Sequence, residues 1–455
     1  MFRKILIANR GEIAVTIIRA CREMGIRSVA VYSEADRDAL HTQLADEAIC
    51  IGPAALPQSY LNAQAILAAC SITGAEAIHP GFGFLSENPV FATMCEKLHI
   101  SFIGPSAEAM RLLGDKATAR KTAAEAGVPI TPGTKDVVPT LAEAKELGAE
   151  VGYPVMVKAA SGGGGRGMRV AMAAHELENA YLAARSEAKA AFGDDRVYIE
   201  RFVEDPRHVE VQIMADRYGN VVHFGDRDCS IQRRNQKMLE EATSPFVDNR
   251  LRKEMGEVAV RLAQAVGYEG AGTIEFLVDR NRNFYFMEMN TRIQVEHPIS
   301  EAITSSNLIK EQIRVAAGYR LSKTQGEIHF NGHAIECRIN AEDPLNNFLP
   351  HPGKIKTLMV PGGIGVRIDS AIYQGYTIPP YYDSMLAKVI VHAPTRAEAI
   401  SRMRRALTEF LVDGVPTNID FHLAILRDPE FISGEYDIGY LNRKLPQIIN
   451  DLQGD

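Results

Sequence analysis

Two apolar segments on either side of a short polar turn predict a β-hairpin late in the chain. Residues 272–278 and 284–289 are rich in aromatic, β-branched and long apolar side chains, as strands are. Antiparallel pairing would bring Glu275 beside Glu288, and Asn290 shares the face of Glu288 because side chains alternate along a strand. Two adjacent carboxylates repel each other unless a cation lies between them. The hairpin therefore predicts a site for a hard cation such as Mg²⁺.

Polar residues continue this two-residue spacing beyond the hairpin. Arg292, Gln294 and Glu296 would place a cation, an amide and a base beside the metal. Taken alone, the same run also fits a surface strand whose charges are solvated.

Composition places the chain among ordinary globular proteins. Of its 455 residues, 46% are hydrophobic and 24% are charged, which predicts two or three domains with sizeable cores. A net charge of −7 argues against a nucleic-acid or anionic-membrane partner. No apolar run approaches the ~20 residues of a membrane span, and no signal-peptide core follows Met1. The cysteines are scattered, so we expect reduced thiols and a cytoplasmic protein.

The N-terminal region predicts a parallel α/β domain. An apolar strand at 4–8 leads through a turn into an amphipathic helix that ends near Gly25, and a second strand follows at 28–32. This β-α-β order predicts a doubly wound parallel sheet up to about residue 114. The first turn lacks G-x-G-x-x-G, which weakens a dinucleotide-binding interpretation.

Two Thr-x-x-Glu pairs predict helix starts further along. Thr140 with Glu143 predicts a capping box before a strand at 154–159, and Thr395 with Glu398 predicts another. The second helix carries an apolar stripe that would pack on a strand at 385–391; its members are Ile400, Met403, Leu407 and Phe410.

A glycine-rich segment follows the strand that contains Lys158. Gly163, Gly164 and Gly165 lie within it, and residues 168–172 resemble a strand, so the segment is a hairpin tip and not a Rossmann or Walker loop. Backbone N–H groups of glycines, which no side chain covers, can fold over phosphates. Lys158 would supply a positive charge to those phosphates. A merely flexible hairpin is the alternative.

Two other features suit a nucleotide. Lys116 could be a second phosphate lysine, although taken by itself it fits a solvated helix lysine better. The backbone of the strand-like segment 198–203 could hydrogen-bond to an adenine, with Glu200 accepting a hydrogen bond from the exocyclic amine of the base.

Several motifs in a fixed order resemble biotin carboxylases of the ATP-grasp superfamily over almost the whole chain. They are KILIANRGEIA at 4–14, HPGFGFLSEN at 79–88, the glycine segment, RDCSIQRR at 227–234 and the run 288–297. The resemblance implies a mixed α/β and α+β architecture. Its parts would be an N-terminal domain at 1–114, an ATP-grasp domain at 115–330 with a mobile lid at about 131–202, and a C-terminal α+β domain at 331–455.

The resemblance also implies a set of ligand-binding residues. ATP would lie near the glycine segment and Lys116, Lys158, Glu200, Val203, His208, Gln232 and Asn235. Mg²⁺ or Mn²⁺ would be held by Glu275, Glu288 and Asn290. Bicarbonate would contact Lys237, Arg292, Gln294, Val295 and Glu296, and biotin would lie near Arg338, Phe82 and Gly83.

The implied chemistry gives these residues roles. Glu296, oriented by Arg292, would remove the bicarbonate proton during attack on the γ-phosphate. Carboxyphosphate would release CO₂ and phosphate, the phosphate would deprotonate biotin, and Arg338 would stabilise the resulting enolate. Phe82 stands where the family usually has tyrosine and Asn235 where it often has histidine, so a hydroxyl contact and a charged nucleotide contact are in doubt.

The sequence contains no Ala-Met-Lys-Met biotin attachment motif and no carboxyltransferase-like segment. We therefore expect biotin to arrive on a separate carrier protein, with a carboxyltransferase on another chain and a homodimer of this one. Acetyl-CoA is the favoured final acceptor, while propionyl-CoA and pyruvate stay open. Another ATP-grasp ligase, forming carbamoyl phosphate or joining a carboxylate to an amine, is the alternative enzyme. A non-catalytic nucleotide-binding module is the alternative outside enzymes.

Overall fold

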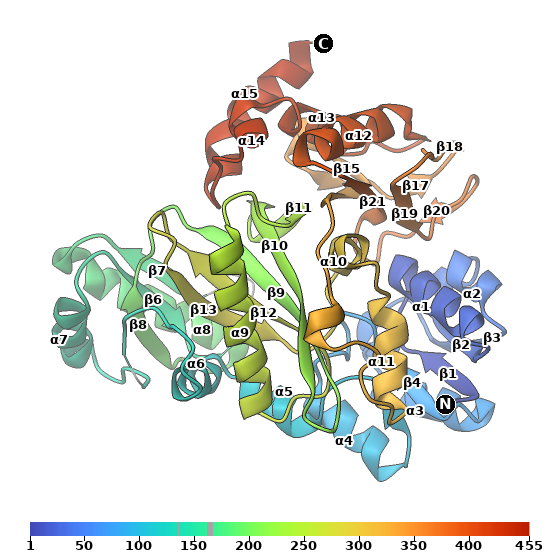
Figure 1. Ribbon diagram of the computed structural model, residues 1–455, viewed down its shortest axis with the longest axis horizontal. Coiled ribbons are helices and arrows are strands. Elements are labelled where there is room, and N and C mark those ends of the chain that lie inside the picture. The colour runs from blue at the N-terminus through green and yellow to red at the C-terminus, as the bar shows by residue number, and fades with distance from the viewer. Residues whose placement is uncertain (135, 162–166, 455) are drawn as a thin grey trace.

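The computed structural model describes residues 1–134, 136–161 and 167–454. Figure 1 shows an N-terminal lobe in blue, a central sheet in green and yellow with a teal lobe projecting from it, and a C-terminal layer in red. Gly163, Gly164 and Gly165 lie outside the described residues. Within the described ranges, no helix is long and apolar enough to cross a membrane.

The N-terminal lobe is the predicted doubly wound domain. Its described strands pair in parallel in the order β3-β2-β1-β4-β5. Ile5 and Ile7 pack on one face of the sheet and Leu6 on the other, which explains why the first strand is apolar throughout. The elements are β1 (Lys4–Ile7), α1 (Gly11–Glu23), β2 (Arg27–Ser33), α2 (Leu40–Leu44), β3 (Glu47–Gly52), α3 (Ala63–Thr73), β4 (Ala77–His79), α4 (Pro89–Lys97), β5 (Ser101–Phe102) and α5 (Ala107–Gly114).

The projecting lobe covers the segment predicted as a lid. Its antiparallel sheet has the order β7-β6-β8, and it has a small core of its own around Val157, Tyr181 and Ile199. The elements, with the preceding connecting helix, are α6 (Lys116–Glu125), α7 (Leu141–Val151), β6 (Val155–Ala159), β7 (Met168–Ala171), α8 (Leu177–Phe192) and β8 (Val197–Arg201).

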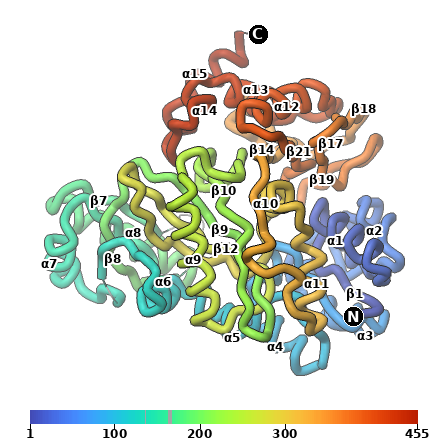
Figure 2. The backbone as a smooth tube through the Cα atoms, in the orientation of Figure 1, coloured from blue at the N-terminus to red at the C-terminus, as the bar shows by residue number. Residues whose placement is uncertain are grey.

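One large sheet joins the central region to the C-terminal layer. In the described chain its strand order is β13-β12-β9-β10-β11-β14-β21-β19. Helix α9 packs against β9 and β10, and α11 lies beside α1 of the N-terminal lobe (Figure 2). The elements are β9 (Arg207–Ala215), β10 (Val221–Arg233), β11 (Gln236–Ala242), α9 (Asn249–Ala265), β12 (Gly270–Val278), β13 (Phe284–Asn290), α10 (His297–Thr304), α11 (Leu308–Ala316), β14 (His333–Asn340), β19 (Val366–Ser370) and β21 (Met385–Ala393).

The C-terminal layer packs its helices on the end of that sheet. The predicted apolar stripe of α12 is buried in one cluster with Ala387, Val389 and Val391 of β21. The helices are α12 (Arg396–Glu409), α13 (Ile419–Ile425), α14 (Pro429–Ser433) and α15 (Tyr440–Gly454). The short strands are β15 (Glu342–Asp343), β16 (Leu349–Pro350), β17 (Gly353–Lys354), β18 (Thr357–Met359), β20 (Thr377–Ile378) and β22 (Leu411–Asp413).

The two predicted capping boxes are half formed. Thr140 caps α7 and Thr395 caps α12, each accepting a hydrogen bond from the backbone N–H three residues on. The glutamate at that third position is exposed in both helices and does not return the bond. Thr324 and Glu327 form the complete reciprocal pair, at a short 3₁₀ helix (Gln325–Glu327).

Candidate active site

A cleft of about 390 Å³ lies between the lid sheet and the face of the large sheet. Its volume is in the range of small-molecule sites. Most of the predicted site residues line it: Lys116, Lys158, Glu200, Val203, His208, Gln232, Asn235, Lys237, Glu275, Glu288, Asn290, Arg292, Gln294, Val295, Glu296 and Arg338. The structure therefore gathers into one cleft predicted residues that are up to 222 positions apart, between Lys116 and Arg338.

Glu200 on β8 organises the lid end of the cleft. Its Oε1 is ion-paired with Lys158, and its Oε2 accepts from Arg120 Nη1 at 3.2 Å and from Thr131 Oγ1 at 3.0 Å. Both carboxylate oxygens thus have partners within the protein. Glu200 fixes Lys158 in this structure, and its contact with an adenine amine stays a prediction. Apolar side chains form the surrounding wall: Met156, Met168, Leu277, Met287 and Ile438.

The hairpin places the predicted metal carboxylates side by side. Glu275 and Glu288 are register partners in the β12–β13 ladder. Asn290 Nδ2 donates to Glu275 Oε1 at 2.9 Å. Lys237 Nζ also lies 3.0 Å from Glu275 Oε1, and Lys116 Nζ lies 3.2 Å from Glu288 Oε2. These oxygens are the hard donors that Mg²⁺ prefers, so the residues fit the metal.

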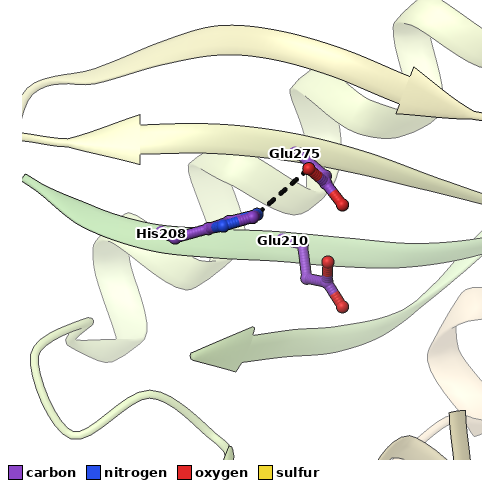
Figure 3. A group of neighbouring side chains, drawn as sticks. All are labelled: His208, Glu210 and Glu275. Atoms are coloured by element: carbon purple, nitrogen blue, oxygen red, sulfur yellow. Dashed lines mark ion pairs between the residues drawn. The ribbon is translucent and has the colours of Figure 1, made fainter. Parts of the chain in front are cut away.

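Charge partners on β11 and β9 adjust the protonation of Glu275. His208 Nε2 lies 3.1 Å from Glu275 Oε2, and Figure 3 shows both side chains together with Glu210. Burial alone would raise the pKa of Glu275, but Lys237 and His208 outweigh it and hold that pKa well below its usual range. Burial also opposes the charged form of His208, yet Glu275 raises its pKa overall. An ionised carboxylate is the form that a cation requires.

Glu296 lies between two cations at the inner end of the cleft. Lys237 Nζ donates to Glu296 Oε1 at 2.7 Å, and Arg338 Nη2 donates to Oε2 at 3.0 Å. Burial would raise the pKa of Glu296, but Lys237 and Arg338 hold it well below its usual range. Arg338 Nε also donates to Glu240 Oε1 at 2.6 Å. The carboxylate is therefore ionised and fixed in direction.

Arg292 contacts different partners from the one predicted. Its Nε donates to Glu87 Oε2 at 2.9 Å and its Nη2 to Asn290 Oδ1 at 2.9 Å. In this structure Lys237 and Arg338, and not Arg292, orient Glu296. Arg292 instead joins the N-terminal lobe to the β12–β13 hairpin through Glu87 and Asn290.

Three family models cover the chain almost from end to end. Residues 1–110 match the biotin carboxylase N-terminal domain, 115–324 the carbamoyl-phosphate synthase L chain ATP-binding domain, and 336–443 the biotin carboxylase C-terminal domain. Biotin carboxylase 1 of Bacillus subtilis is 58% identical over 442 residues, covering 97% of this chain and 98% of that protein.

The chain belongs to the biotin carboxylase family.

Solved structures agree with this assignment. Biotin carboxylase from Campylobacter jejuni is 51% identical with a TM-score of 0.95, covering 97% of this chain and 99% of that one. The biotin carboxylase domain of 2-oxoglutarate carboxylase from Hydrogenobacter thermophilus is 48% identical with a TM-score of 0.94, covering 99% of both chains. The predicted family and three-part fold are confirmed, and the chain is an ATP-dependent ligase.

Two buried residues of the site are not among those predicted from the sequence patterns. Glu210 Oε2 accepts from Lys237 Nζ at 2.6 Å, and Glu210 Oε1 accepts from Arg227 Nε at 2.6 Å. His208 and Glu210 are two residues apart and share a face of β9, so the two-residue spacing that pointed to Glu288 and Asn290 could also have pointed to Glu210. Arg227 stands out in the sequence only as part of the motif at 227–234.

Of the two residues that depart from the family pattern, Asn235 lies at the cleft and Phe82 does not. Asn235 lines the cleft, as predicted for a nucleotide contact. Phe82 and Gly83 are not among the residues that line it; the Phe82 carbonyl accepts from Asn9 Nδ2 at 2.7 Å within the N-terminal lobe. A biotin contact by Phe82 or Gly83 stays a prediction.

Proposed function

We propose that this chain carboxylates biotin with ATP and bicarbonate, and that the cleft residues have the roles given below. The observation that carries the proposal is Glu296 held between Lys237 and Arg338 in the cleft that also contains Lys116, Lys158 and the carboxylate hairpin. The relative from Hydrogenobacter thermophilus, solved with ADP, its magnesium salt and bicarbonate, supports the same ligands here.

The first step is phosphoryl transfer to bicarbonate. A bicarbonate oxygen attacks the γ-phosphorus, ADP leaves, and Glu296 accepts the bicarbonate proton, giving carboxyphosphate. Lys237 neutralises the anion. An anion beside Lys237 would draw part of that charge away from Glu296 and raise its pKa, making it a better base when substrate is bound. Mg²⁺, or Mn²⁺ in its place, would supply charge neutralisation for the phosphates at Glu275, Glu288 and Asn290.

The second step is transfer to biotin. Carboxyphosphate breaks down to CO₂ and phosphate, and the phosphate takes the proton from the biotin ureido nitrogen. Arg338 stabilises the negative oxygen of the resulting enolate, whose nitrogen then bonds to CO₂. Because Arg338 is tied to Glu296 and Glu240, its guanidinium is already in place before biotin arrives.

The assembly around the chain is part of the proposal. We place biotin on a separate carrier protein, the carboxyltransferase on another chain, and the enzyme in the cytoplasm as a homodimer; the Hydrogenobacter thermophilus domain was solved as a dimer. Acetyl-CoA is the proposed final acceptor, as in fatty-acid synthesis. Pyruvate is the competing acceptor because a pyruvate carboxylase chain of Methanothermobacter thermautotrophicus is 56% identical over 435 residues.

The domain limits 1–114, 115–330 and 331–455 also belong to the proposal.

The decisive experiment is ADP release with bicarbonate, with and without free biotin, combined with detection of carboxybiotin. Biotin-stimulated ADP release with carboxybiotin supports the proposal. ADP release that needs an amine and ignores biotin would indicate a different ATP-grasp ligase. Pairing the chain with carrier and carboxyltransferase proteins, and supplying acetyl-CoA or pyruvate, identifies the acceptor.

A further inference from the structure

Lys388 lies fully buried behind the catalytic loop, which we define as residues 291–296 between β13 and α10. It stands on β21 with 0% of its surface exposed, and its Nζ donates to the Val295 carbonyl at 2.8 Å. Lys388 does not line the cleft. Burying a charged lysine costs free energy unless nearby groups compensate the charge, so the groups around Lys388 must offset that cost.

Two acidic residues from different parts of the chain compensate that charge. Glu12 Oε1, on α1 of the N-terminal lobe, lies 3.1 Å from Lys388 Nζ, and Asp369 Oδ2 on β19 lies 3.9 Å away. Burial lowers the pKa of Lys388, but Glu12 and its other acidic neighbours outweigh it and raise that pKa overall. The lysine is therefore a charged donor on the large sheet that pairs with the N-terminal lobe through Glu12.

The carbonyl of Gln294, one residue earlier in the catalytic loop, is also held by a buried side chain. His297 Nδ1 lies 2.8 Å from the Gln294 carbonyl oxygen. Burial, with the positive charge of Lys388, holds the pKa of His297 well below its usual range, so the ring is neutral and Nδ1 carries the proton that it donates. Two consecutive backbone carbonyls, Gln294 and Val295, are thus fixed by buried side chains.

We infer that Lys388 is a positioning residue for the bicarbonate end of the site, acting through the Val295 carbonyl on the direction of Glu296. The peptide unit between Val295 and Glu296 is planar and includes the Cα of Glu296, so fixing its carbonyl also fixes the atom from which the Glu296 side chain projects. Glu12 serves as the counter-ion that the N-terminal lobe supplies. The inference rests on the proposed function, because it assigns Lys388 to the bicarbonate step.

The competing explanation is that Lys388 and Glu12 only hold the lobes together. Lys388→Met removes the donor and the charge but keeps the length of the side chain. It also leaves Glu12 without its cation, which could by itself prevent folding. The double variant Glu12→Gln with Lys388→Met removes both charges and is expected to recover much of the melting temperature. Lys253→Met, at an exposed lysine on α9, is the matched control.

The experiment measures bicarbonate and ATP Michaelis constants, melting temperature, and amide hydrogen exchange in residues 292–296. We expect the bicarbonate constant to rise roughly 10- to 150-fold in both Lys388 variants, the equivalent of one charge-assisted hydrogen bond. The ATP constant should change far less, and exchange in the loop should accelerate. Lys253→Met should behave as the unaltered protein.

Two results would overturn the inference. One is a double variant that recovers both its melting temperature and its bicarbonate constant, because Lys388 would then be only structural. The other is unchanged loop exchange in both Lys388 variants. The proposed function fails on a separate result, namely the absence of bicarbonate-dependent ADP release from the unaltered protein. Hydrogen exchange in residues 292–296 does not depend on turnover, so it tests the positioning role of Lys388 even then.

Discussion

Glu275 and Glu288 face each other across the β12–β13 hairpin, and each carboxylate is held by a different lysine. Lys237 lies 3.0 Å from Glu275, and Lys116 lies 3.2 Å from Glu288. The repulsion that predicted a cation is therefore relieved by two ammonium groups in this structure. When phosphates and a divalent ion bind, the same lysines are free to pair with phosphate oxygens, so the hairpin can exchange one set of cations for another.

Glu288→Lys should abolish magnesium-dependent ATP cleavage. The substitution replaces a proposed metal ligand by a cation next to Lys116, and loss of one electrostatic contact in an active site typically costs roughly 10²–10³-fold in rate. ADP release should be measured against magnesium concentration, with Glu288→Gln as the milder matched variant. Full turnover in a folded Glu288→Lys protein would remove Glu288 from the metal site.

Glu296→Ala and Arg338→Ala should separate the two half-reactions. Without Glu296, bicarbonate-dependent ADP release and carboxybiotin formation should both fall by about 10²–10⁴-fold, as expected for loss of a general base. Without Arg338, carboxybiotin formation should fall roughly 10- to 150-fold while biotin-independent ADP release survives. Because Arg338 also contacts Glu296, both activities must be measured on the same preparations. Equal loss of both in Arg338→Ala would place that arginine in the first step.

Glu241 should make the stability of the protein sensitive to acid. It is fully buried on β11, accepts from Arg396 at 2.7 and 2.9 Å, and lies 2.7 Å from His333 Nε2. Burial would raise the pKa of Glu241, but His333 and Arg396 lower it to about 2. Since the folded value lies below the ordinary 4.5, the unfolded chain takes up the proton first as pH falls. The resulting stabilisation, about 3 kcal/mol, is present above pH ~4.5 and is lost between there and pH ~2.

Urea unfolding of the unaltered protein and of Glu241→Gln tests this. The difference between them should be largest near neutral pH and should shrink as pH falls below about 4.5. A difference that stays constant down to about pH 3 would contradict the linkage.

Arg227→Met should destabilise the protein far more than an exposed arginine substitution. Arg227 is fully buried and hydrogen-bonds to Glu210, Gln212, Ser300, Thr273 and Gln294. Removing one partner of a buried ion pair typically costs about 3–5 kcal/mol. Arg217→Met, which breaks exposed contacts with Glu269 and the Ala316 carbonyl, should cost less than about 1 kcal/mol. Equal urea midpoints for the two variants would show that Lys237 alone satisfies Glu210.

The hairpin and the first sheet could be predicted because their signals are local. Alternating side chains and a short turn determined that Glu275 meets Glu288, and the structure has that register. The place of Arg338 came only from the family resemblance, because β14 reaches the site by pairing with β11 across about 90 residues. Lys388 could not be anticipated, since a lysine in an apolar strand gives no sign of which carboxylates or carbonyls will surround it.

The continuous sheet limits how the polypeptide can be divided. β11 and β14 pair along Leu239–Cys337 to Ala242–Ala334, so the ladder crosses the sequence limit proposed at residue 330. A fragment ending there would present β11 as an exposed edge with unpaired N–H and C=O groups, which is a template for aggregation. The lid has its own sheet and core, so it is the part best suited to removal or exchange between relatives. Chimeric enzymes should therefore be joined at the lid and not at the middle of the large sheet.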